Sequence, residues 1–182
     1  GLKGNQSSTQ EMLDAGIKLK TVRLYYNGVP HESMSFPTFE FEELINTSWE
    51  QSEIREDFVD WKLMVFVFRD NNIGIPVFEK IVFWNIPNSI VDGQIRGMYE
   101  LVAELVKNGN ALYYDKNGKV RDNFPKEKRN SNGVCHVRPH AGKAIHVFSL
   151  PIVDKITRKT TYTKQCFWFN KSFVKKEILK NY

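Results

Sequence analysis

Residues 63–84 read LMVFVFRDNNIGIPVFEKIVFW. The two apolar stretches in this segment, residues 63–68 and 77–84, have the length of ordinary strands and are rich in β-branched and aromatic side chains. Between them, two asparagines and Gly74 favour a turn. The segment therefore predicts two strands of a sheet with a short connection.

Three further elements are expected on either side of these strands. Residues 18–26 alternate in part between apolar and polar side chains, which indicates a strand, and the Asn-Gly pair at 27–28 favours a turn. Residues 39–61 are acidic and have apolar residues at helical spacing, which predicts one or two helices with a solvated carboxylate face. Residues 95–106 form one apolar stripe and are expected to be a helix that ends at the Asn-Gly pair 108–109.

The last third of the chain combines a polar segment with two more strands. Residues 115–133 are rich in Gly, Asn and Lys and are expected to form a mobile loop without regular structure. Residues 134–138 and 165–169 are expected to be short strands, and a lysine-rich helix capped by Asn170 or Ser172 is expected to follow. Helices interspersed among strands indicate an α/β or α+β fold with a mixed central sheet flanked by helices.

The length of 182 residues fits a single domain with a sizeable core. Residues 1–10 are polar and are interpreted as a flexible lead-in or the end of a linker, and residues 11–182 as one domain. No apolar run approaches the roughly eighteen residues of a membrane span, and the first residues lack a signal-peptide layout. Cys135 and Cys166 match no zinc spacing, so we expect free thiols in a reducing compartment.

Charge is distributed unevenly along the chain. Residues 1–114 contain 10 Lys and Arg against 16 Asp and Glu, a balance of −6, whereas residues 115–182 contain 16 against 5, a balance of +11. A strongly basic half points to a polyanionic partner, and nucleic acid is the leading candidate. The alternative is that the C-terminal lysines only solvate a helix and loops.

Five further stretches carry more information than composition does: GIKLKT at 16–21, ESMSF at 32–36, FEEL at 41–44, CHVRPH at 135–140 and FWFNKSF at 167–173. Together they resemble the MutH family, which comprises mismatch-repair nicking endonucleases and related restriction enzymes that cut at the sequence GATC. The family's strand reads Gly, an aliphatic residue, Glu, Leu, Lys, Thr. The resemblance extends over nearly the whole chain from about residue 11 and is strongest to the C-terminal half of a restriction enzyme of this family.

The resemblance implies a type II restriction endonuclease-like fold and double-stranded DNA as the partner. It also implies an N-terminal companion domain of the same fold in the same protein, with an intact metal site, paired with this domain as a pseudo-dimer. The full-length enzyme would use Mg²⁺ and work in the interior of a bacterial cell. No membrane contact is expected.

Nucleases of this class place two carboxylates and a lysine around a divalent metal, which activates the attacking water. Matched to the family motif, Glu11 occupies the upstream acid position, Lys18 the position of the Glu, and Lys20 that of the Lys. An ammonium at residue 18 repels Mg²⁺. We therefore expect this domain to bind no metal or cofactor and to cut no DNA, although Lys18 and Lys20 could hold phosphate without a metal. The plain alternative for both lysines is a polar strand face.

The resemblance also implies DNA contacts. Arg138 lies beside a family segment that enters the major groove, where an Arg can pair with a guanine edge; the alternative is a surface salt bridge. Trp168 matches a family Tyr near DNA, with core packing as the alternative. Lys171, Lys175 and Lys176 are interpreted as phosphate contacts, with a solvated helix face as the alternative. The complete set of expected DNA-binding residues is Lys20, Arg138, Pro139, His140, Lys143, Trp168, Lys171, Lys175 and Lys176.

The function implied by the resemblance is that of a recognition or effector domain of a type II restriction endonuclease, which binds GATC in double-stranded DNA and does not cut it. Two rival functions remain open. The first is an active Mg²⁺-dependent nuclease that uses Glu11, Asp14 and Lys20, which metal-dependent nicking of GATC duplexes by this chain would reveal. The second is a protein-interaction module that uses the acidic face of residues 40–60. Absence of DNA binding at low salt would favour the second.

Overall fold

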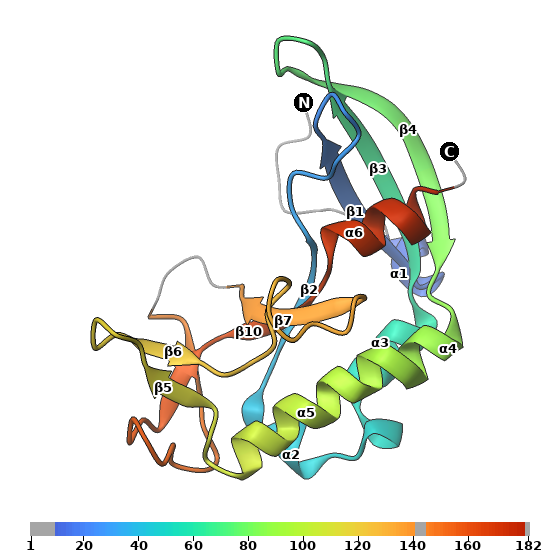
Figure 1. The fold of residues 1–182 in the computed structure, drawn as a ribbon. Helices are drawn as coiled ribbons and strands as arrows, with labels where there is room; N and C mark the ends of the chain where they lie inside the picture. Colours follow the sequence, from blue (N-terminus) through green and yellow to red (C-terminus); the bar gives the residue numbers. More distant parts are fainter. Residues whose placement is uncertain (1–9, 141–144, 181–182) are drawn as a thin grey trace.

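The computed structural model describes residues 10–140 and 145–180. Figure 1 shows a sheet of long strands at one end of the molecule, a second sheet across its middle, and the long helix α5 along the side below the second sheet. The α+β class expected from the sequence is confirmed, with the difference that the strands form separate sheets.

The first sheet contains the three long strands β1 (Ile17–Leu24), β3 (Lys62–Asp70) and β4 (Pro76–Asn85). β1 runs parallel to β3, β4 runs antiparallel to β3, and the sheet is therefore mixed as expected. The register pairs Lys18 with Leu63 and Lys20 with Val65. Because Leu63 and Val65 are fully buried, the two lysines extend from the face of β1 that covers the core.

The second sheet is antiparallel, with β10 (Gln165–Phe169) between β2 (Met34–Phe39) and β7 (Cys135–Pro139). The two strands expected here from the sequence, β7 and β10, are confirmed. β2 was not expected from the sequence, and it contains Pro37. A proline removes a ladder donor and is tolerated on an edge strand, which is the place of β2 in this sheet.

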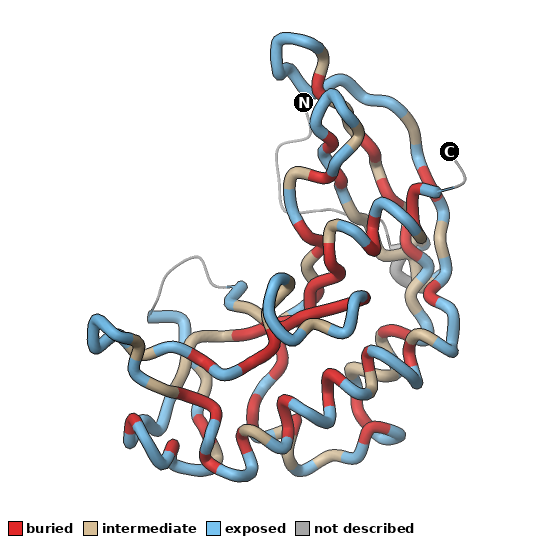
Figure 2. The backbone as a smooth tube through the Cα atoms, in the orientation of Figure 1, coloured by how far each residue is buried: buried red, intermediate tan, exposed pale blue. Residues whose placement is uncertain are grey.

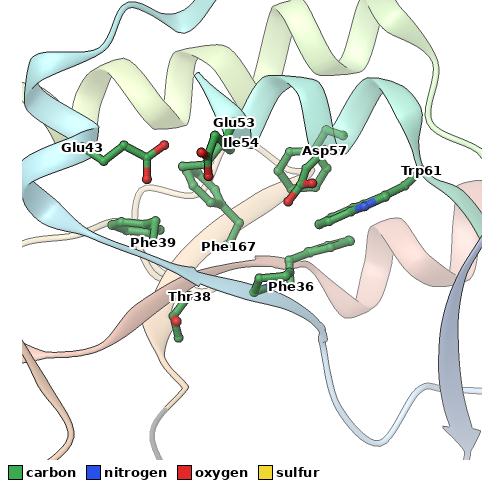
Figure 3. Close-up of a pocket in the computed structure, with 11 residues that line it drawn as sticks. Phe36, Thr38, Phe39, Glu43, Glu53, Ile54, Asp57, Trp61 and Phe167 are labelled. Carbon is green, nitrogen blue, oxygen red and sulfur yellow. The ribbon is translucent and has the colours of Figure 1, made fainter. Parts of the chain in front are cut away.

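The acidic segment forms α2 (Phe41–Asn46), a 3₁₀ turn η1 (Trp49–Gln51) and α3 (Glu53–Asp60), which confirms the expected helices. The expectation of a fully solvated carboxylate face is wrong in part. Glu43 and Asp57 are only half-exposed, because α2 and α3 pack over the aromatic side chains of β2 and β10 (Figure 3).

The expected long helix is also present. A short helix α4 (Asn88–Ile90) and a π-helical turn η2 (Val91–Ile95) lead directly into α5 (Arg96–Lys107). The chain leaves α5 through Gly109, whose φ of +63° suits a glycine after a helix end. Figure 2 shows buried positions recurring along one side of α5 and along β10. Within the described residues, no helix is long and apolar enough to cross a membrane.

The terminal helix begins as expected but is not capped as expected. It consists of α6 (Lys171–Phe173) and a π-helical turn η3 (Val174–Ile178), and its first backbone N–H, that of Lys171, is accepted at 2.6 Å by Oε1 of Glu127 and not by Asn170. Asn170 occupies the N-cap position, but its Oδ1 lies 2.6 Å from Nδ1 of the buried His136. The Asn170 side chain therefore satisfies a buried imidazole instead of the helix N-terminus.

The polar segment after residue 114 is a correction. Where a mobile loop was expected, β5 (Leu112–Tyr114) and β6 (Val120–Asp122) form a hairpin. The turn is built by Asp115, whose Oδ1 accepts the backbone N–H groups of Asn117 (2.9 Å) and Lys119 (3.0 Å). The polar residues that resemble a loop in the sequence are the residues that form this turn.

Three small elements complete the fold. α1 (Gln10–Asp14) precedes β1, and β8 (Val147–Ser149) pairs with β9 (Thr161–Thr163). Cys135 and Cys166 are free thiols, as expected, and both are fully buried. Burial raises the pKa of the Cys166 thiol to about 11, which keeps it protonated.

Candidate nucleic-acid interface

A cleft of about 510 Å³ lies between β1 and the segment that leads into β2, and it extends to the ends of β7 and β10. Four of its lining side chains carry a positive charge or can take one up: Lys20, Arg23, His31 and His140. Glu32 is the only carboxylate among the described side chains that line it. This balance of charge favours an anionic ligand such as a phosphate group.

Lys20 is held on the wall of the cleft. Its ammonium donates to the backbone carbonyl of Ser35 and lies 4.6 Å from the centre of the Phe36 ring. Burial, with a smaller contribution from the positive charge of Lys18, lowers the pKa of Lys20 to about 8. The side chain is therefore mostly charged at neutral pH and loses its charge in mildly alkaline solution.

Lys18 extends from the same face of β1 but does not line the cleft. Its ammonium lies 4.9 Å from the centre of the Trp61 ring. Burial raises the pKa of Asp57, and the nearby charge of Lys18 opposes that rise. Lys18 therefore places a positive charge beside a carboxylate of α3, at the position where the family motif has a metal ligand.

The residues present do not fit a divalent metal. Glu11 and Asp14 both lie on α1 and are exposed, and neither belongs to the described side chains that line the cleft. In residues 10–140 and 145–180, no three His, Cys, Asp or Glu side chains gather closely enough to hold a metal ion. Glu11 and Asp14 thus lie outside the cleft that Lys20 lines.

Arg138 lies near the end of β7 and is half-buried. The central carbon of its guanidinium lies 3.7 Å from the centre of the Trp168 ring on the neighbouring β10. Among the described residues, no carboxylate lies within ion-pair distance of Arg138. The alternative of a surface salt bridge is therefore not realised there, and the donors of the guanidinium are left for another acceptor.

Neither Arg138 nor Pro139 lines the cleft, but His140 and Trp168 beside them do. Pro139 ends β7 and is exposed, and the exposed His140 lines the cleft with its ring 5.2 Å from that of Trp168. Trp168 is only 6% exposed, which agrees with the packing alternative for its ring. Lys143 lies outside the described residues.

The lysines of the terminal helix have different surroundings. The Lys171 ammonium donates to the backbone carbonyl of His31 at 2.6 Å and is therefore engaged within the fold. Lys175 and Lys176 are exposed on η3. Lys175 lines a separate cavity beside Lys80, so the structure does not bring these two lysines to the cleft.

A group of charged residues at one end of the cleft was missed by the sequence analysis. The buried Asp70 accepts hydrogen bonds from Arg23 Nε at 2.7 Å and pairs with His31 Nε2 at 2.8 Å, and Tyr25 stacks on His31. The bond from Arg23, aided by that from His31, holds the pKa of Asp70 below its usual range. No local sequence pattern indicates this group, because Asp70 lies on β3 whereas Arg23 lies on β1 and His31 follows β1.

The acidic residues of α2 and α3 surround a second, smaller cavity of about 170 Å³ (Figure 3). Figure 3 shows Glu43, Glu53 and Asp57 on one side of it and the rings of Phe36 and Phe167 on the other. Burial, with repulsion from neighbouring carboxylates, raises the pKa of Glu43. The acidic face considered for protein binding is therefore partly turned into the molecule.

Comparison with known proteins shows which endonucleases this chain is similar to. Residues 1–90 match the family model described as DNA mismatch repair enzyme MutH. The chain is thus a relative of the MutH-like endonucleases and has their type II restriction endonuclease-like fold, as the sequence motifs predicted. It is 29% identical over 195 aligned residues to the type II restriction enzyme Sau3AI of Staphylococcus aureus. That alignment covers 93% of this chain but 39% of the enzyme, so the chain spans less than half of the length of this relative.

Proposed function

We propose that the chain is a recognition domain that binds double-stranded DNA at GATC and does not cut it. The observation that carries this proposal is the basic cleft, where the strand that corresponds to the family's cutting strand meets the segment of Arg138. Lys20 is placed to contact phosphate there, since it is cationic and lines the cleft, whereas the Arg23 guanidinium on the same wall is already paired with Asp70. Arg138, without a carboxylate partner among the described residues, is the residue we assign to a guanine edge.

The assignment as a domain that does not cut DNA rests on Lys18. A positive charge in a metal-ligand position repels Mg²⁺, and the carboxylates of α1 do not line the cleft. We propose that Mg²⁺-dependent cutting belongs to a companion domain of the same fold within a longer protein, paired with this one as a pseudo-dimer. By binding DNA, the present domain would then either clamp the target or favour the cutting state of the companion. The second possibility requires that DNA bind with different affinities to the cutting and non-cutting states of the enzyme.

The test uses the chain itself and two duplexes of equal length, one with GATC and one with the same bases scrambled. Binding is measured for each at several salt concentrations, and each duplex is then incubated with Mg²⁺ or Mn²⁺. We expect tighter binding to the GATC duplex, a steep decrease of affinity with salt, and no nicking. Equal affinity for the two duplexes would contradict the assigned specificity, and metal-dependent nicking would contradict the absence of cutting.

A further inference from the structure

The ring of Trp168 supports the side chain of Arg138. Trp168 lies on β10 and pairs with His136 of β7, so its ring reaches diagonally across the ladder toward Arg138. The guanidinium carbon stands 3.7 Å from the ring centre, which is the distance of a stacked contact. The indole Nε1 also donates to the backbone carbonyl of Arg138 at 3.3 Å, so the same ring contacts both the main chain and the side chain of that residue.

The ring itself is poorly placed to touch DNA. Trp168 is 6% exposed, and the His140 ring packs against it in a T-shaped arrangement at a centroid distance of 5.2 Å. Arg138 and His140 therefore cover much of the indole. A guanidinium stacked on a ring presents its π face to the ring and keeps its N–H edge free to donate in its own plane.

We infer that Trp168 is a positioning residue for sequence reading, which acts by holding the Arg138 guanidinium flat while the N–H edge meets a base. This inference rests on the proposed function. An arginine has several rotatable bonds, and holding it in one arrangement before binding removes part of the entropic loss on association. The gain belongs only to the duplex whose base accepts both donors, so it increases discrimination and leaves non-specific binding unchanged.

The experiment compares the variants Trp168→Leu, Trp168→Phe and Arg138→Ala with the unmodified chain on matched and scrambled duplexes at one salt concentration. Trp168→Leu removes the aromatic face, and we expect it to lower the ratio of the two affinities about tenfold, with little change on the scrambled duplex. Trp168→Phe keeps a flat ring and should retain most of the ratio. In an Arg138→Ala background, Trp168→Leu should cause no further loss, because the residue it supports is absent.

The outcomes separate the inference from the proposed function. If Arg138→Ala abolishes discrimination and Trp168→Leu preserves it, the positioning role is wrong and sequence reading stands. Equal losses on both duplexes for Trp168→Leu would also overturn the positioning role, because the ring would then support only the fold or general binding. If the unmodified chain does not discriminate, it is the proposed function that fails.

A second measurement needs no stable Trp168→Leu variant. In the free, unmodified chain the side-chain Hε and Hδ resonances of Arg138 should be displaced upfield by the indole ring. The displacement should persist, with reduced size, in Trp168→Phe. Random-coil shifts for Arg138 in the unmodified chain would overturn the inference whatever the binding data show.

Discussion

The Lys18 ammonium lies 4.9 Å from the centre of the Trp61 ring, beside the carboxylate of Asp57. Two residues further along β1, Lys20 lies over Phe36 and reaches the basic cleft. The strand that would hold a metal in a cutting enzyme thus presents two cations, each over an aromatic ring. Such contacts stabilise by about 0.5–2 kcal/mol each, depending on exposure, so the lysines have a structural role as well as an electrostatic one.

The first prediction concerns Lys18. Lys18→Glu places a second carboxylate beside Asp57 and removes the contact with Trp61, so we expect it to destabilise the fold by roughly 1–3 kcal/mol. Lys62→Glu, an exposed lysine on β3, is the matched control and should change stability little. Urea unfolding at pH 7 measures both variants. Equal stabilities for the two would mean that Lys18 makes no contribution through Trp61 and Asp57.

The second prediction concerns the charge of Lys20. Because its pKa is lowered to about 8, the ammonium is lost as the pH rises from 7 to 9, and DNA affinity should decrease over that range. Lys20→Met should bind more weakly at pH 7, lose about one unit of the salt slope, and lack this pH dependence. Fluorescence anisotropy across pH and salt measures both effects.

Lys107→Met is the control for the second prediction, because Lys107 is exposed at the end of α5 and does not line the cleft. It should leave both the slope and the pH profile unchanged. A Lys20→Met variant that still lost affinity between pH 7 and 9 to the same extent would remove Lys20 from the interface.

The third prediction uses the half-buried Glu43. Its folded pKa is raised by burial, so the protonated form fits the fold better, and the ionised form lowers stability as the pH rises above this pKa. Glu43→Gln should therefore raise the melting temperature at pH 7 by about 1–3 °C, and this advantage should shrink as the pH falls through the raised pKa of Glu43 toward the ordinary range of a glutamate. Glu42→Gln, at the exposed neighbouring position, is the control and should show neither effect. A lower melting temperature for Glu43→Gln at pH 7 would contradict the assigned cost of burial.

The fold could be predicted from the sequence where one segment determines its own structure. The strands β1, β3 and β4 and the helix α5 follow from apolar patterns and turn residues within each segment. β2 could not be predicted in this way, because a strand that contains Pro37 exists only where an edge position next to β10 is available. The β5–β6 hairpin was missed because its Asp115 turn and a disordered loop have similar compositions.

In the candidate site, the residues within family motifs could be predicted from the sequence, whereas the contacts between distant segments could not. Lys20, Arg138, His140 and Trp168 were identified by family motifs. The structure places Lys20, His140 and Trp168 at one cleft, and Arg138 lies over the Trp168 ring without lining the cleft itself. The pairing of Asp70 with Arg23 and His31 depends on contacts between distant segments and has no local signature. The position of Lys175 and Lys176 outside the cleft likewise depends on where η3 packs, which charge along the sequence does not indicate.

The central claim is that this chain reads DNA sequence through Arg138. It is tested most directly by a competition titration of the unmodified chain, Arg138→Ala and Lys175→Ala against GATC and scrambled duplexes at a single salt concentration. We predict that Arg138→Ala loses roughly 1–3 kcal/mol on the GATC duplex and much less on the scrambled one. Lys175→Ala, outside the cleft, should change both affinities slightly and equally. Equal losses on the two duplexes for Arg138→Ala would contradict the claim and leave Arg138 as a phosphate contact.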